Sequence, residues 1–175
     1  MSDSWEDHPA VASALAVVRN RTDDVEVSWE PYLLVVRDTI AAVGVRNSES
    51  RSVALVNHID GRWRTPPLVT TVMLPLQAPA RTFRPSFIQR LSVKQAGSPS
   101  ADGRPPEVAW TVLAGFLAAD VRSGVTQSSI DEYEADVADD GFILAVLRAR
   151  WREKLAMIAI MNDGRHIPCI HPSLR

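Results

Sequence analysis

The sequence predicts an α+β fold in which a mainly antiparallel, curved sheet carries helices packed on one of its faces. Two observations lead to this prediction. Alternating and β-branched segments, which are typical of strands, follow one another from about residue 23 to residue 95, and one of them ends in a tight-turn signal. The stretches 107–122 and 129–141 instead show the apolar periodicity of helices.

We expect one domain over residues 1–175. This length is usual for a single core, and 46% of the residues are apolar, which is enough to build that core without disulfides or metals. The segment 96–106 is rich in glycine and proline and lacks large apolar side chains, so it is a loop. It separates a strand-rich part, 23–95, from a part with helices and strands, 107–175.

A short helix opens the chain. Asp7 or His8 can cap its start, and Pro9 follows at the first helical position, where the missing amide hydrogen costs nothing. The helix should end by residue 24, after an apolar stripe formed by Val11, Ala14, Leu15 and Val18.

The strand-rich part should contain several strands and one hairpin. The expected strands cover 25–29, 32–37, 40–46, 52–59, 68–76 and 87–94. Asp60 and Gly61 form a type I′ turn signal between 56–59 and 62–65, because both residue types accept a positive φ. This pattern predicts a β-hairpin.

Two helices are expected after the loop. The first covers 107–122, and apolar residues surround it almost completely, which is typical of a buried or interfacial helix. The second begins at a capping box formed by Ser129 and Glu132 and ends near Gly141. Large side chains expected in the core are Trp110, Phe116, Leu117, Tyr133 and Trp151.

The segment 142–161 fits both a strand pattern and a helical stripe. Its alternation of apolar residues with arginines favours two strands joined near 152–154. A tight turn at 162–164 should then lead into a last strand over 165–170.

Composition and charge narrow the possible environments and partners. The net charge of −2 gives no general attraction for nucleic acids, which makes them disfavoured partners. Cys169 is the only cysteine, so an intrachain disulfide is excluded. The first eight residues are acidic and polar, unlike a secretory signal, and no apolar run approaches the roughly 18–20 residues that span a bilayer. The sequence therefore predicts a cytoplasmic protein with no membrane partner.

Imidazole and thiol groups gather near the C-terminus, where His166, Cys169 and His171 lie within six residues. Zn²⁺ binds such ligands, but in an extended segment Cys169 and His171 share one face while His166 points to the other. We therefore favour an ordinary terminal strand with a buried cysteine, keep the zinc site as the alternative, and expect no cofactor. His171 could also activate Cys169 as a nucleophile, although no helix N-terminus or glycine-rich turn is evident beside it.

Motifs with a strong catalytic signature are absent from the sequence. Our first hypothesis is therefore a non-catalytic protein-interaction or regulatory domain that acts through a homodimer or a partner interface. We expect Trp110, Phe116 and Trp151 in that interface, because aromatic residues are enriched at such surfaces.

The alternative hypothesis is a small-molecule-binding protein or enzyme. In that case the curved sheet encloses a pocket, and His58 acts as the acid or base beside Asp60 and Arg62.

Overall fold

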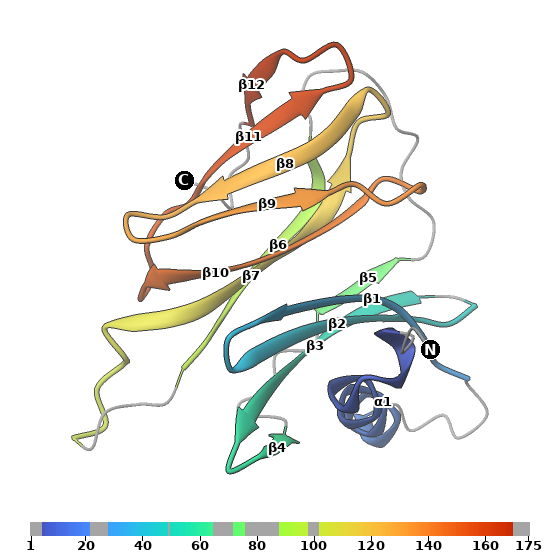
Figure 1. Ribbon diagram of the computed structural model, residues 1–175, viewed down its shortest axis with the longest axis vertical. Coiled ribbons are helices and arrows are strands. Elements are labelled where there is room, and N and C mark those ends of the chain that lie inside the picture. The colour runs from blue at the N-terminus through green and yellow to red at the C-terminus, as the bar shows by residue number, and fades with distance from the viewer. Residues whose placement is uncertain are drawn as a thin grey trace. The chain divides into compact units, whose positions relative to one another are not determined.

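The computed structural model describes six stretches of the chain (Figure 1): 5–21, 28–48, 50–64, 72–75, 88–97 and 102–169. The chain divides into two compact units, Met1–Gln77 and Ala78–Arg175. The single domain expected over 1–175 stays a prediction.

The expected α+β class is wrong. Strands make up 58% of the structure and helix only 11%, so the fold is mainly antiparallel β. One α-helix is present among the described residues, and the two helices expected after the loop are strands. That helix is also too short to span a membrane, and no helix in the described part of the chain is long and apolar enough to do so.

The first unit combines a helix with one antiparallel sheet. Its elements are the 3-10 helix η1 (Trp5–Asp7), the helix α1 (Pro9–Arg21) and the strands β1 (Glu30–Arg37), β2 (Ile40–Arg46), β3 (Ser50–Ile59), β4 (Arg62–Arg64) and β5 (Val72–Pro75). The strand order is β1-β2-β3-β4, and β5 pairs with the first residues of β3. The opening helix and the strands expected over 32–37, 40–46 and 52–59 are confirmed, whereas most of the strand expected over 25–29 lies outside the described residues.

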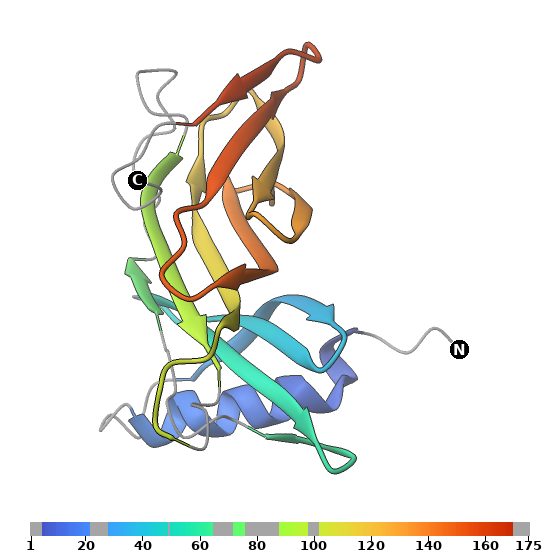
Figure 2. The same ribbon diagram turned by 90° about the vertical axis from the view of Figure 1, so that its left-hand side faces the viewer.

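Helix α1 covers one face of this sheet (Figure 2). The expected apolar stripe is buried at Val11, Ala14 and Val18, and Leu15 packs at its margin. These side chains meet alternate residues of the strands, since every second side chain points to the same face of a sheet. The strand side of this core consists of Ala41, Val43, Val45, Ala54 and Val56.

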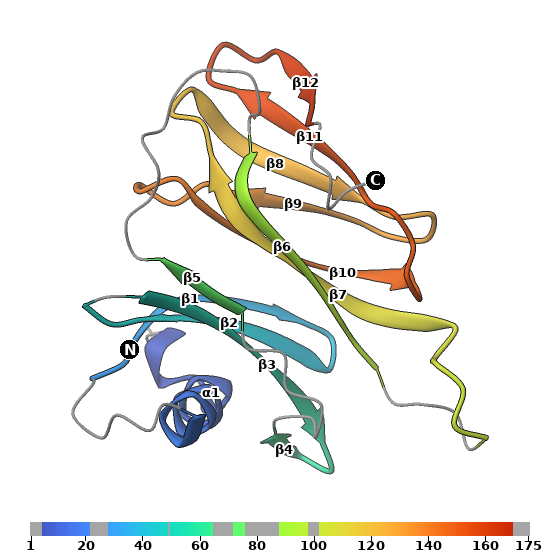
Figure 3. The same ribbon diagram turned by 180° about the vertical axis from the view of Figure 1, so that it is seen from behind.

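The second unit contains two sheets. Its strands are β6 (Ile88–Ala96), β7 (Val108–Leu117), β8 (Val121–Gln127), β9 (Glu132–Asp136), β10 (Phe142–Arg150), β11 (Ala156–Met161) and β12 (His166–Pro168). One sheet has the order β10-β7-β6, as seen from behind in Figure 3, and the other has the order β12-β11-β8-β9. The strand expected over 87–94 is confirmed as β6.

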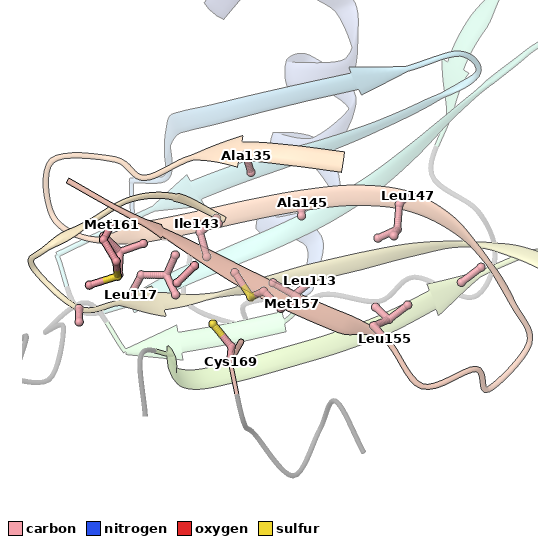
Figure 4. Close-up of a cluster of buried hydrophobic side chains, with 14 residues drawn as sticks. Leu113, Leu117, Ala135, Ile143, Ala145, Leu147, Leu155, Met157, Met161 and Cys169 are labelled. Carbon is pink, nitrogen blue, oxygen red and sulfur yellow. The ribbon is translucent and has the colours of Figure 1, made fainter. Parts of the chain in front are cut away.

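Side chains from both sheets form the core of the second unit (Figure 4). Leu113 of β7 and Ile143 of β10 come from the first sheet, and Met157 and Met161 of β11 come from the second. Each of these side chains is almost fully buried, and such burial contributes about 1.5–3 kcal/mol per large apolar side chain. Close packing also explains Gly124, where a Cβ atom would lie 2.5 Å from Cε of Met157.

The helix expected over 107–122 is replaced by β7, a short turn and β8. Strand β7 is central in its sheet, because β10 pairs with one edge and β6 with the other. Residues 111–118 are buried without interruption. A central strand that is buried on both faces is apolar at every position, so it has the same all-round apolar pattern as a buried helix.

The helix expected from Ser129 is also wrong, since this region forms β9. The hydroxyl that organises the segment belongs to Ser128 instead. Its Oγ accepts hydrogen bonds from the backbone N–H groups of Ile130 and Asp131, at 3.2 and 3.0 Å. This is a serine turn, which is a local alternative to a helix N-cap.

The strand interpretation of 142–161 is confirmed by β10 and β11. Glu153 stabilises the turn between them by accepting a hydrogen bond from the backbone N–H of Arg150, at 2.8 Å. The next turn contains Gly164 with φ of 84°, and the short strand β12 follows as expected. Of the large side chains expected in the core, Phe116 and Leu117 are fully buried, whereas Trp110, Tyr133 and Trp151 are half-buried.

Candidate functional site

The predicted hairpin at Asp60 and Gly61 is confirmed, and it joins β3 to β4. Asp60 has φ of 51° and Gly61 has φ of 73°, as a type I′ turn requires at both central positions. Strand β2 ends its pairing with β3 where Ile40 faces Asn57. His58 and Ile59 therefore extend beyond β2, and residues 58–64 form a projection that we call the hairpin tip.

The hairpin tip is anchored by Trp63, whose ring lies near two imidazoles. His58 is the cross-strand partner of Trp63, and their ring centroids are 5.0 Å apart at an interplanar angle of 45°. His8 approaches the same indole edge-to-face at 5.2 Å. The hydroxyl of Ser13 on α1 also donates a hydrogen bond to the carbonyl of Trp63, at 3.0 Å. The tip is thus fixed to helix α1 as well as to β3.

His8 has a second role at the start of α1. Its Nδ1 accepts a hydrogen bond from the backbone N–H of Ala10, at 3.2 Å. This bond satisfies one of the N–H groups that a helix leaves without an intrahelical partner at its first turn. One imidazole therefore links the helix start to the hairpin.

The residues proposed for acid–base chemistry all lie at the surface of the hairpin tip. His58, Asp60 and Arg62 are exposed, and within the described residues no hydrogen bond joins the imidazole of His58 to a carboxylate. An acid or base works best when a second group orients it. The described contacts of the His58 ring are with Trp63, and the acid–base role of His58 beside Asp60 and Arg62 stays a prediction.

Apolar surface accompanies these polar groups. Ile59 is 45% exposed, and Arg62 and Arg64 beside it are also exposed. Sequence analysis did not single out Ile59, because an isoleucine at the end of a strand gives no signal of whether its side chain is covered.

The structure separates the three residues of the C-terminal cluster. His166 is exposed on β12, Cys169 is buried, and His171 lies outside the described residues. Within the part of the chain that the structure describes, no three His, Cys, Asp or Glu side chains are placed to hold a metal ion. The zinc alternative, which needs His171, stays a prediction.

Burial determines the chemistry of Cys169. It raises the pKa of the thiol from 9.0 to about 11, because a thiolate is poorly solvated among apolar side chains. Met157 and Leu113 belong to the same core cluster. At neutral pH the thiol is protonated, so Cys169 is a packing residue and a poor nucleophile.

The three residues expected in an interface occupy different environments. Trp110 on β7 and Trp151 after β10 are half-buried, whereas Phe116 is only 1% exposed. The Phe116 ring packs edge-to-face on Phe142, its cross-strand partner, with centroids 5.4 Å apart. Phe116 therefore contributes to the interior, and the two tryptophans offer at most part of their surface to a partner.

A scan against protein-family models matches none of them, and searches of curated proteins and of solved structures find no significant match.

Proposed function

We propose that this chain is a non-catalytic protein-interaction domain that binds its partner through the hairpin tip. The observation that supports this most directly is the exposed Ile59 beside Arg62 and Arg64 on a projection that is held from two sides. Contact surfaces combine an apolar centre with a polar, solvent-accessible rim, and Ile59 with the two arginines has this arrangement on a small scale.

Rigidity supports the same proposal. Trp63 packs against two imidazoles, and its carbonyl accepts the hydrogen bond from Ser13. The turn itself has the backbone geometry that matches the twist of the flanking strands. A tip that is already ordered loses little conformational entropy on binding, which favours affinity.

A surface that is complementary to the hairpin tip has an apolar side chain to contact Ile59 and carboxylates to face Arg62 and Arg64. This chain carries such a surface around β9. Ile130 is 44% exposed, and Glu132, Glu134 and Asp136 are exposed at alternate positions of the strand. Alternate positions share one face, so these carboxylates form a single acidic row. We therefore propose that copies of the chain associate, with the hairpin tip of one on the β9 surface of another.

Sedimentation velocity over a range of concentrations tests this association. The wild-type chain should self-associate, and Ile59→Asp should weaken the association at least about tenfold, because a carboxylate replaces the apolar anchor and faces other carboxylates. Val36→Asp is the matched control, since Val36 is 42% exposed on β1 and lies outside the tip. It should change the association less than about twofold.

A charge exchange tests the pairing itself. Reversing Arg62 and Arg64 to glutamate should weaken the association, and so should reversing Glu132 and Glu134 to arginine. A chain that carries all four changes should associate again, because the attraction is restored with opposite signs. A wild-type chain that stays monomeric up to about 200 µM would reject the proposal, because a Kd well above this concentration corresponds to a binding free energy of less than about 5 kcal/mol. Equal effects of Ile59→Asp and Val36→Asp would also reject it.

The cellular location of the chain is part of the same proposal. A cytoplasmic location agrees with a single, buried cysteine, because disulfides are rare in that compartment. Fractionation of cells that produce the chain would test this location.

A further inference from the structure

Strand β1 lies at the edge of the first sheet (Figure 1). Strand β2 pairs with one side of β1, and among the described residues no strand pairs with the other side. A strand edge without a partner presents a row of backbone N–H and C=O groups, which a further strand can bind. The outer edge of β1 is therefore a candidate surface for an extended polypeptide.

The turn after β1 determines which backbone groups point outward. Only the two residues 38–39 separate Arg37 from its cross-strand partner Ile40. Residues that flank a two-residue turn form a hydrogen-bonded pair, and such pairs alternate with non-bonded pairs along an antiparallel ladder. Leu34 and Val36 are therefore in non-bonded pairs and direct their N–H and C=O groups away from β2. Outside the strand ladder, no hydrogen bond among the described residues involves their backbone.

One part of this edge is protected against pairing and the other is not. Proline, charged side chains and bulges are the usual protection of an edge strand. Pro31 and the shift of register between Pro31 and Leu33 supply it at the start of β1. Residues 33–36 consist of leucine and valine, which favour strands and bring neither charge nor proline. Val36 is also 42% exposed, so a partner can reach this part of the edge.

The side chains beside the edge favour an apolar partner. Leu34 packs against the core under α1, and Val36 points to the same face because it is two residues further along the strand. The 3-10 helix η1 lies beside β1, and its Trp5 is 41% exposed. A strand added to β1 would place every second side chain on this face. Apolar, β-branched residues at those alternate positions fit best.

We propose that the outer edge of β1 at residues 33–36 binds an extended segment of a partner protein as an added antiparallel strand, with β-branched apolar residues at alternate positions. In this mode of recognition the main-chain hydrogen bonds give affinity and the alternate side chains give specificity. A linear segment suits this edge better than a second folded copy does. A stable contact between folded chains buries about 800 Å² on each partner, which is more than so short an edge offers. The edge is separate from the hairpin tip, and its test does not depend on the association of copies.

Hydrogen exchange of the whole chain, followed by NMR, tests the proposal with a capped synthetic peptide of alternating threonine and valine between terminal serines. In the free chain, the amide hydrogens of Leu34 and Val36 should exchange faster than those of Leu33 and Val35, which bond to β2. Saturating peptide should slow the exchange at Leu34 and Val36 at least about tenfold.

Two N-methylated peptides are matched controls for each other. The valines of the bound peptide face Leu34 and Val36 and exchange hydrogen bonds with them, whereas the threonine N–H groups point away from β1. N-methylation of the valines should therefore raise the Kd at least about tenfold, and N-methylation of the threonines should leave it within about threefold.

A pair of variants at one position tests the same bond from the side of the protein. Val36→Pro removes one outward N–H and should raise the Kd of the unmodified peptide at least about tenfold. Val36→Thr keeps the N–H and the β-branched shape, so it should leave the Kd within about threefold. Far-UV circular dichroism checks that both variants are folded, and the N-methylated peptides decide the question if Val36→Pro is not.

Several outcomes would overturn the proposal. One is a peptide that does not bind at concentrations up to about 1 mM. Another is an equal loss of binding for the two N-methylated peptides, or for Val36→Pro and folded Val36→Thr. A weaker self-association of Val36→Pro than of Val36→Thr in sedimentation would identify a second copy as the occupant, which also contradicts the proposal.

Discussion

Gly61→Ala isolates the energetic cost of the hairpin turn, because nothing but the backbone opposes the change. The residue has φ of 73°, in the left-handed region that L side chains rarely adopt. A Cβ added there meets no atom within 4 Å, so steric overlap with neighbours contributes nothing. The loss of stability must therefore come from backbone strain in the folded state, reduced by the lower entropy of the unfolded chain.

These two effects set the magnitude. A left-handed residue with a Cβ costs about 1–2 kcal/mol, and replacing glycine by alanine lowers the entropy of the unfolded chain by about 0.4–1 kcal/mol. The free energy of unfolding should thus fall by about 0–1.6 kcal/mol, and the midpoints of the two ranges give about 0.8 kcal/mol. Gly61→Asn should cost less than Gly61→Ala, because asparagine tolerates this conformation better. Gly164 has φ of 84° and equally open surroundings, so Gly164→Ala should cost a similar amount.

Urea denaturation followed by far-UV circular dichroism measures these differences. The midpoint should shift at constant m, since the substitution changes no buried surface. A gain in stability for Gly61→Ala, or a larger loss for asparagine than for alanine, would refute the reasoning from φ.

The remaining predictions concern the buried groups of the second unit. The pKa of Cys169 is raised from 9.0 to about 11 on folding. The free energy of unfolding should therefore be unaffected by this thiol below pH 9 and should fall by up to about 2–3 kcal/mol as the pH rises to 11. Urea titrations at several pH values should show this loss in the wild type and not in Cys169→Ala. Phe116→Ala should lower the unfolding free energy by about 3–5 kcal/mol, because the ring is fully buried against Phe142. A loss under about 1 kcal/mol would contradict the burial of Phe116 and would favour the interface position expected from the sequence.

Elements with local signals were predictable. Helix α1 has a proline at its first position and an apolar stripe at helical spacing, and both act within a few residues. The turn at Asp60 and Gly61 is equally local, because its two residue types determine the turn geometry. These features need no knowledge of the rest of the chain.

Strand β7 shows why the fold class was not predictable. Its side chains are buried along residues 111–118, and this burial depends on β6 and β10, which come from distant parts of the sequence. Without those partners the pattern of apolar residues fits a buried helix equally well. The β-branched and aromatic residues of 108–117 favour a strand, but they do not exclude the buried helix that the apolar pattern also fits.

The hairpin tip was predictable as a turn but not as an anchored surface. His8 and Ser13 precede Trp63 by about fifty residues, and only the packing of α1 on the sheet brings them together. The sequence singled out His58, yet its stacking on Trp63 follows from their register across the hairpin.

The contact of Tyr32 with Arg46 and Arg51 depends on a smaller structural detail, which is a bulge in β1. Arg46 and Arg51 flank the turn at Asn47, so their pairing follows from the hairpin between β2 and β3. Tyr32 joins them because the register of β1 against β2 shifts between Pro31 and Leu33. A bulge changes the direction of a side chain within a strand, and proline is tolerated at such positions. Removing the bulge by deleting one residue would move Tyr32 away from the arginines, so the contact of its ring with both guanidinium groups requires this irregularity.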